Sequence, residues 1–145
     1  MSQYLAPVFG TGEDGVLTIS SNTTDSPIDS SCSGTSGTTS LSATNASFEA
    51  GQLILIHQSR GTGVGQWELN KISSYVAGTI TTVLSLSYTY TDSGASQAQV
   101  LVVKQYSGIT INSGKTLTAK AWDGNIGGIL AYFCSGATTI RDDNC

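Results

Sequence analysis

The sequence is poor in charge, histidine, proline and cysteine. Six basic and ten acidic side chains give the 145 residues a net charge of −4, and there are one histidine, two prolines and three cysteines. The six cations are scattered along the chain, so the basic surface that grips nucleic-acid phosphates is excluded. A chain this sparsely charged that is still 39% hydrophobic is typical of a folded domain, not of a disordered segment.

Long apolar runs are also missing. The first twelve residues, MSQYLAPVFGTG, lack the positive region and apolar stretch of a signal peptide, and no run reaches the 18 apolar residues that a membrane helix needs. We therefore expect no membrane partner, and synthesis in the cytoplasm without export by the ordinary route.

The three cysteines, Cys32, Cys134 and Cys145, are too far apart in sequence for a zinc knuckle. Cys134 lies in the apolar run ILAYFC, which predicts a buried thiol. Cys145 follows a polar stretch and is expected to be exposed. It could pair with Cys32, pair with a symmetry mate, or stay unpaired.

Small polar residues and β-branched residues are what the chain has in quantity. Gly, Ser and Thr fill 57 positions (17, 21 and 19), and short Val-, Ile- and Thr-rich stretches recur between them. This pattern predicts an all-β fold with an antiparallel, barrel- or sandwich-like core. Strands are expected at about 15–20, 52–58, 66–74, 79–86, 98–105, 108–112, 115–120, 128–134 and 137–141.

Residues 21–47 are an exception to this pattern. They are rich in Ser and Thr with scattered apolar side chains, which predicts a long surface loop or arm. The predicted organisation is therefore an N-terminal segment over residues 1–14 and one β domain over residues 15–145, with 21–47 as the loop. If the loop lies across a neighbour, its apolar residues Pro27, Ile28 and Leu41 are the expected anchors.

The sequence carries no complete catalytic motif. His57, the one imidazole, ends an apolar strand with no nucleophile motif beside it, which favours a structural histidine. A glycosidase site requires two carboxylates across a cleft, and Glu68 and Asp123 are the one pair of acids that also follow tryptophans able to stack on a sugar, but nothing predicts a cleft around them. We expect a non-enzymatic protein with no cofactor and no metal.

Aromatic residues allow three interpretations. Tyr88 and Tyr90 have period-two spacing on one strand face, and Trp67 and Trp122 lie near strand ends. Such rings could stack on a glycan, form a protein interface, or cover the core at the strand ends.

A family resemblance rests on four stretches. They read FEAGQLILIHQSRGTGVGQWELNKI at 48–72, LSYTYT at 86–91, AQVLVVKQY at 98–106 and INSGKTLTAKAWDGNIGGILAY at 111–132. Together they resemble a β-rich module of phage virion proteins and bacterial adhesins, in which similar phrases lead into a parallel β-solenoid. The resemblance implies short solenoid-like strands at the C-terminal end. Such strands would expose sheet edges, which a trimer around a three-fold axis could cover.

A short β protein of this type looks like a phage capsid decoration, or cement, protein. The resemblance implies a homotrimer on the outer capsid surface, made in the host cytoplasm, that binds and stabilises the major capsid protein shell. Under it, the expected capsid or subunit contacts are Tyr4, Leu5, Val8, Phe9, Pro27, Ile28 and Leu41, and Cys32 and Cys145 are candidates for an inter-subunit disulfide. The alternative is a receptor- or glycan-binding module of a tail fibre or adhesin, which would use Trp67, Tyr88, Tyr90 and Trp122.

Overall fold

The computed structural model describes residues 8–142, and every regular element in that range is a β-strand. The all-β prediction is confirmed. By its backbone contacts the chain divides into two compact units. The first, here the barrel unit, is built on Pro27–Val103 with Trp122–Ile126. The second, here the solenoid unit, takes in the described residues 8–26, 104–121 and 127–142. The prediction of one domain over 15–145 did not anticipate this division.

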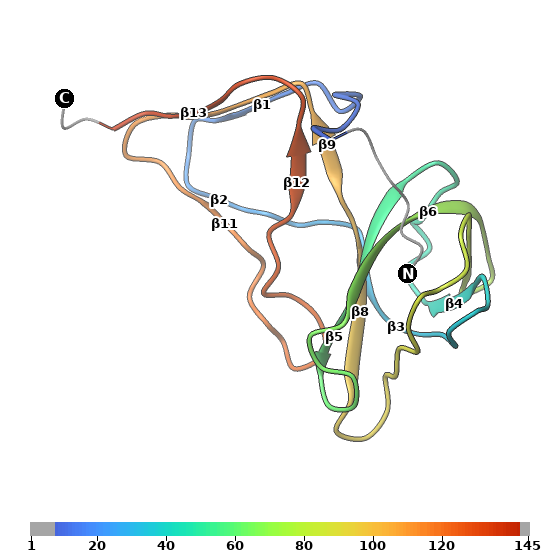
Figure 1. Cartoon of the computed structure of the whole chain (residues 1–145). Helices are drawn as coiled ribbons and strands as arrows, with labels where there is room; N and C mark the ends of the chain where they lie inside the picture. Colours follow the sequence, from blue (N-terminus) through green and yellow to red (C-terminus); the bar gives the residue numbers. More distant parts are fainter. Residues whose placement is uncertain (1–7, 143–145) are drawn as a thin grey trace. The chain divides into compact units, whose positions relative to one another are not determined.

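The barrel unit is a closed barrel of six strands in which every neighbouring pair is antiparallel (Figure 1). Around the barrel the strands are β3 (Asp29–Ser33), β4 (Ser40–Ala43), β7 (Thr79–Thr82), β6 (Trp67–Val76), β5 (Leu53–Arg60) and β8 (Gln97–Val102). Closure gives every strand two hydrogen-bonded neighbours, so the barrel has no free edge. The predicted antiparallel core is this barrel.

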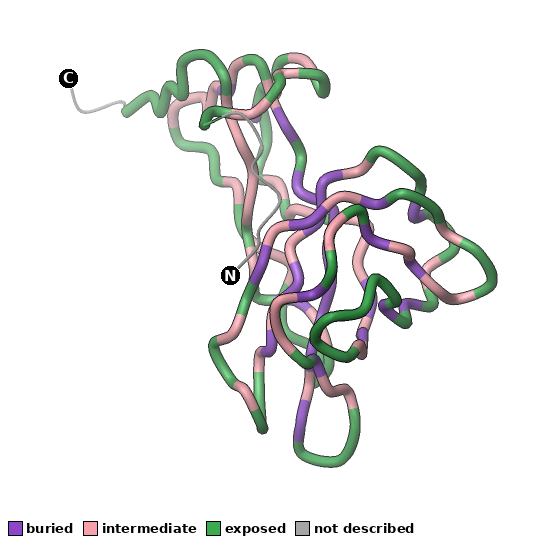
Figure 2. The backbone as a smooth tube through the Cα atoms, turned by 45° about the vertical axis from the view of Figure 1, so that its right-hand side comes forward, coloured by how far each residue is buried: buried purple, intermediate pink, exposed green. Residues whose placement is uncertain are grey.

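The alternation of buried and more exposed residues along the barrel strands determines which side chains form the core. In β4 exposed residues alternate with buried ones, and in β3 and β7 half-buried residues alternate with buried ones. In Figure 2 the buried residues gather in the barrel strands, whereas the strands of the solenoid unit are largely half-buried or exposed. The core residues include Cys32, Leu41, Phe48, Ile54, Ile56, Ile72, Ile80, Leu86, Tyr90 and Val100.

The connection between β7 and β8 fills the barrel. Leu86 and Tyr90 on this connection are fully buried in the core. The connection runs beside the turn between β3 and β4, where Gly34 and Tyr90 exchange backbone hydrogen bonds of 3.0 and 2.8 Å. Backbone and side chains therefore both anchor the connection.

The solenoid unit is built from parallel pairs (Figure 1). Strands β1 (Val16–Ile19), β10 (Gly108–Ile111) and β13 (Thr138–Ile140) form one three-stranded sheet in that order. The remaining pairs are β2 (Thr23–Thr24) with β11 (Leu117–Thr118), and β9 (Lys104–Tyr106) with β12 (Tyr132–Cys134).

These pairings form three successive rungs, in agreement with the solenoid-like strands that the resemblance implies. The first rung, β1 and β2, comes from the N-terminal part of the chain, and the barrel sequence is inserted between it and the second rung. Asp14 joins the first two rungs, because its carboxylate accepts from the Lys104 ammonium at 3.0 Å and from the Gln105 amide at 2.7 Å.

The loop predicted over residues 21–47 is corrected in part. The stretch contains β2 and two barrel strands, β3 and β4. Its sparse apolar residues alternate with hydroxyls, so that Cys32, Leu41 and Ala43 face the core, together with the buried Ser30, while Ser31, Ser33, Ser40 and Ser42 face outward. The density of Ser and Thr masked a period-two pattern, which requires few apolar residues in strands this short.

A substitution at Gly34 tests how the β7–β8 connection packs against the barrel interior. A Cβ at this position would lie 2.6 Å from Leu86 Cδ1 and 2.9 Å from the Ser40 carbonyl oxygen. We predict that Gly34→Ala destabilises the barrel by about 1–3 kcal/mol and lowers its melting temperature by roughly 2–10 °C. Gly108→Ala is the control, because its nearest neighbours are 3.8 Å away. Calorimetry that finds equal melting temperatures for both variants would contradict this packing.

Candidate functional site

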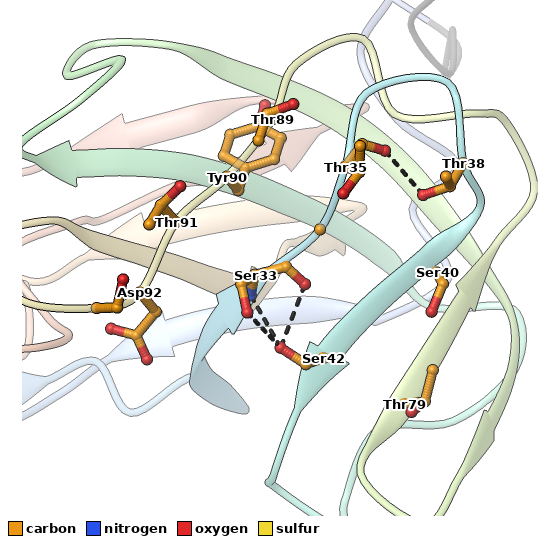
Figure 3. A pocket seen from close by; sticks show the side chains of 12 residues that line it. Ser33, Thr35, Thr38, Ser40, Ser42, Thr79, Thr89, Tyr90, Thr91 and Asp92 are labelled. Atoms are coloured by element: carbon orange, nitrogen blue, oxygen red, sulfur yellow. Dashed lines mark hydrogen bonds between the residues drawn. The ribbon is translucent and has the colours of Figure 1, made fainter.

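A shallow groove of about 560 Å³ lies on the barrel unit (Figure 3). It is formed by the turn between β3 and β4 with the adjacent strand ends, and by residues 89–93 of the β7–β8 connection. Hydroxyl side chains dominate its lining, and Asp92 is its one charged residue. The lining residues are Ser33, Gly34, Thr35, Thr38, Ser40, Ser42, Thr79, Thr89, Tyr90, Thr91, Asp92 and Ser93.

Several of these hydroxyls are held in place by local hydrogen bonds. Ser33 and Ser42, on neighbouring strands, lie with their Oγ atoms 2.8 Å apart, and Ser42 Oγ also accepts from the Ser33 amide at 3.0 Å (Figure 3). Thr38 Oγ1 donates to the Thr35 carbonyl at 2.7 Å. The groove therefore presents oriented hydroxyls on strands, an arrangement suited to polar, polyhydroxylated ligands.

A buried carboxylate holds the connection that lines one side of the groove. Glu68 accepts from the Ser87 amide at 2.9 Å and from the Tyr90 hydroxyl at 3.1 Å, and it is fully buried. Burial raises the pKa of Glu68, and these hydrogen bonds partly oppose the shift. Burial together with the adjacent Glu68 raises the pKa of Tyr90 far above its usual range, so the phenol stays protonated as a donor.

Two further buried polar side chains hold the same connection. Gln58 Oε1 accepts from the Thr91 amide at 2.9 Å, and Gln58 Nε2 donates to the Thr91 carbonyl at 2.9 Å. In the same way, Asn70 Oδ1 accepts from the Leu84 amide at 3.1 Å, and Asn70 Nδ2 donates to the Leu84 carbonyl at 2.9 Å. Amide side chains can satisfy a backbone N–H and C=O together, so the connection is fixed without being part of a sheet.

The outer face of the barrel carries a second polar cluster. His57 on β5 lies directly opposite Trp67 on β6 and opposite Gln99 on β8. Ser59 Oγ accepts from Gln99 Nε2 at 2.8 Å and lies 2.9 Å from His57 Nδ1. Burial lowers the pKa of His57. A neutral ring that accepts the Ser59 hydroxyl at Nδ1 carries its proton on Nε2.

The four predicted glycan-stacking residues differ in how far the structure exposes them. Trp67 is 47% exposed beside His57, and Trp122 is exposed in the segment that groups with the barrel. Tyr90 is buried, so its predicted role in stacking is wrong. Tyr88 is half-buried and meets the Tyr90 ring edge-on, with ring centroids 6.4 Å apart. Trp67 and Trp122 remain as exposed indoles.

The predicted contact residues also differ in exposure. Val8 is 82% exposed and Phe9 67% exposed, so both can contact a partner. Leu41 is fully buried in the barrel core, which corrects its assignment as an anchor. Pro27 and Ile28 are half-buried, and Ile28 packs against the core. Tyr4 and Leu5 lie outside the described residues.

The predicted disulfide between subunits is corrected at Cys32. Its thiol is buried in the core, and that burial, with a contribution from Asp92, raises its pKa well above the usual range. A buried, protonated thiol is a poor partner for exchange. Cys145 lies outside the described residues. Cys134, expected to be buried, is half-buried on β12 with its Sγ 3.5 Å from the Gly136 carbonyl oxygen.

The two acids of the glycosidase alternative have local hydrogen-bonding roles. Glu68 is buried, as described above, and Asp123 Oδ1 accepts from the Asn125 and Ile126 amides at 2.9 and 3.0 Å. Within residues 8–142 no group of three His, Cys, Asp or Glu side chains is placed to hold a metal ion. No helix in the described part of the chain is long and apolar enough to span a membrane.

The groove and the His57–Ser59–Gln99 cluster were not predicted. The groove depends on Ser and Thr residues from β3, β4 and the β7–β8 connection, and sequence gives no sign that these meet. His57, Ser59 and Gln99 come from two strands, so only the period-two spacing of His57 and Ser59 hinted at a shared face.

Comparisons with known proteins give little similarity. No protein-family model and no curated protein matches the chain. Among solved structures, the chain is similar to the Gp54 tailspike of Acinetobacter baumannii bacteriophage AP22, described in complex with A. baumannii capsular saccharide. The TM-score is 0.46 at 10% identity, over 88% of this chain and 26% of the tailspike. The chain thus spans about a quarter of that protein's length.

The pH dependence of stability tests the buried Glu68. Because the folded-state pKa is raised, its contribution is fully present below the unfolded-state pKa and is lost as pH rises through the folded-state value. We predict that the wild type loses stability relative to Glu68→Gln as pH rises above about 4, since glutamine keeps an acceptor and cannot ionise. Urea unfolding at several pH values measures this difference. Parallel pH profiles for the two proteins would contradict it.

Proposed function

We propose that the protein is a non-enzymatic structural component of a phage virion that works by contact. In its specific form it is a homotrimeric decoration protein, made in the host cytoplasm and placed on the outer capsid surface, where it binds the major capsid protein and stabilises the shell. The resemblance of residues 48–132 to phage virion modules motivates the setting. The features below support the mode of action.

The observation that carries the proposal is the exposed apolar surface of the solenoid unit. Five large apolar side chains of this small unit are exposed: Val8, Phe9, Val16, Leu130 and Ile140. Each of these side chains offers apolar area that a partner surface could bury. Its outer strands β1 and β13 are also sheet edges, which can pair with another chain.

Each unit is ordered by itself. The barrel is closed and has Leu86 and Tyr90 packed in its core, so little ordering cost remains for contacts made by the barrel's own surface. The low charge keeps a contact free of strong repulsion, although the net charge of −4 still favours a partner surface that is not acidic.

Phe9 provides the test. We predict that Phe9→Ser weakens binding to capsids that lack the protein by about tenfold or more, because burying an aromatic ring contributes roughly 1.5–3 kcal/mol. The measurement is co-sedimentation of purified protein with such capsids. Val64→Ser is the control, since Val64 is equally exposed on a barrel hairpin. Equal binding by the two variants, or no co-sedimentation of the wild type, would overturn the proposal in this form.

A second function, glycan binding, is favoured by the outer face around Trp67. An exposed indole beside an imidazole can stack on a sugar ring and hydrogen-bond to its hydroxyls. His57 stands directly opposite Trp67 and supplies the imidazole. Gln99, on the other side of His57, is buried and holds Ser59 in place.

A glycan array separates the two functions. If the protein binds a glycan, we predict that Trp67→Ala reduces the signal about tenfold or more, because the stacking platform is lost. Val76→Ala is the matched control, since Val76 is exposed on the same strand. A silent array for the wild type, or loss of signal in the control as well, would remove the Trp67 face as a glycan site.

A further inference from the structure

The three-stranded sheet of the solenoid unit repeats the same side chains from rung to rung. Thr18, Thr110 and Thr139 stand in register across β1, β10 and β13. Ile19, Ile111 and Ile140 stand in register one position later. In-register stacking of identical side chains is a favourable way to extend a parallel sheet. The first and the last rung therefore share one pattern.

The three isoleucines in register become more exposed from the first rung to the last. Ile19 is 2% exposed on β1, Ile111 is half-buried on β10, and Ile140 is 72% exposed on β13. All three project from the same side of the sheet, because in a parallel pair residues in register share a face. Ile140 thus occupies a core position whose next neighbour along the ladder is absent from the described chain.

Both outer strands keep a backbone edge that could pair again. In the sheet order β1–β10–β13, the central strand has two neighbours, and β1 and β13 have one each. Neither strand contains a charge or a proline, and no register shift accompanies their pairing with β10. Register shifts do occur in the barrel pairs of β5 with β8 and of β6 with β7. Charge, proline and bulges, which block many edge strands, are thus missing from β1 and β13, and the short length of the two strands, four and three residues, is the one such feature that they have.

We propose that β13 of one copy pairs in parallel with β1 of a second copy. The two edges are complementary: they run in the same direction in the sheet, and the contact continues the established β10–β13 ladder. It places Ile140 against Ile19 and Thr139 against Thr18 of the next copy, which repeats both side-chain ladders once more. A second copy fits this edge because its first rung already carries the required sequence.

This contact joins two different surfaces and is therefore heterologous. Such a contact forms a ring if its rotation closes and a linear stack if it does not. The inference goes beyond the proposed function, because the contact needs neither a capsid nor a three-fold axis. Loss of capsid binding would leave it intact, and loss of the contact would leave capsid binding through Phe9 to be measured separately.

Cysteine cross-linking tests the pairing. The variants Thr18→Cys and Thr139→Cys are made separately in a Cys134→Ser/Cys145→Ser background, which leaves the buried Cys32. Mixed under mild oxidation, the two proteins should form a disulfide-linked heterodimer roughly tenfold faster than either protein links to itself. Strands in direct register lie within disulfide reach, whereas Thr18 and Thr139 of one chain are two strand spacings apart, about 10 Å.

The matched control replaces Thr18→Cys with Thr62→Cys, an exposed position on a barrel hairpin. Equal cross-linking of Thr139→Cys with either partner would overturn the proposal, and so would fast self-linking of Thr139→Cys alone, which indicates a symmetric edge contact.

Light scattering gives a second readout that needs no cysteine. Thr139→Lys adds a charge at the edge and should shift the wild-type oligomer toward monomer, whereas Thr62→Lys, with the same change in net charge, should not. A wild type that stays monomeric at every concentration reached would also overturn the proposal.

Discussion

Every strand edge in this protein must either be paired or remain available for pairing, and the two units meet this constraint in opposite ways. The barrel closes on itself, so its six strands satisfy one another. The solenoid unit stacks three rungs and, within residues 8–142, leaves β1 and β13 with one neighbour each. Backbone hydrogen bonding, more than composition, therefore distinguishes the two units: the barrel pairs all its strand edges internally, whereas the solenoid unit presents edges with which another chain could pair.

The buried polar residues of the barrel follow from the same constraint. A closed barrel has no strand position left for the β7–β8 connection, so the backbone of the connection is satisfied partly by the backbone of the β3–β4 turn and partly by side chains. Glu68, Asn70 and Gln58 do this from inside, and Leu86 and Tyr90 supply the apolar packing. The connection then forms one wall of the hydroxyl-lined groove. Charge burial, which costs stability when unpaired, is here partly offset by three donors to Glu68.

Much of the fold could be predicted from the sequence, because β-branched runs bounded by Gly, Ser and Asn specify strands locally. The strand from Leu53 to Arg60 and the strands near the C-terminal end follow from such runs, whereas the parallel, solenoid-like arrangement of the latter is implied by the family resemblance. Strands β3 and β4 could not be predicted, because Leu41 and Cys32 are lone apolar residues among hydroxyls. The candidate sites depend on which strands become neighbours, and neither the Ser33–Ser42 pair nor the Gln99–Ser59 contact leaves a local signal.

The low charge content of the chain has a structural consequence in the solenoid unit, where the edge strands are uncharged. Charged residues on edge strands are a common way to prevent unwanted pairing, and β1 and β13 carry none, although Arg141 and Asp142 follow β13 directly. A chain with 16 charges could have placed one on either edge at little cost, since Thr18 and Thr139 both face solvent. Both positions instead carry threonine, so the first and the last rung present the same side chain to a neighbouring strand. Edges that are uncharged, parallel and alike in sequence favour association between copies over isolation.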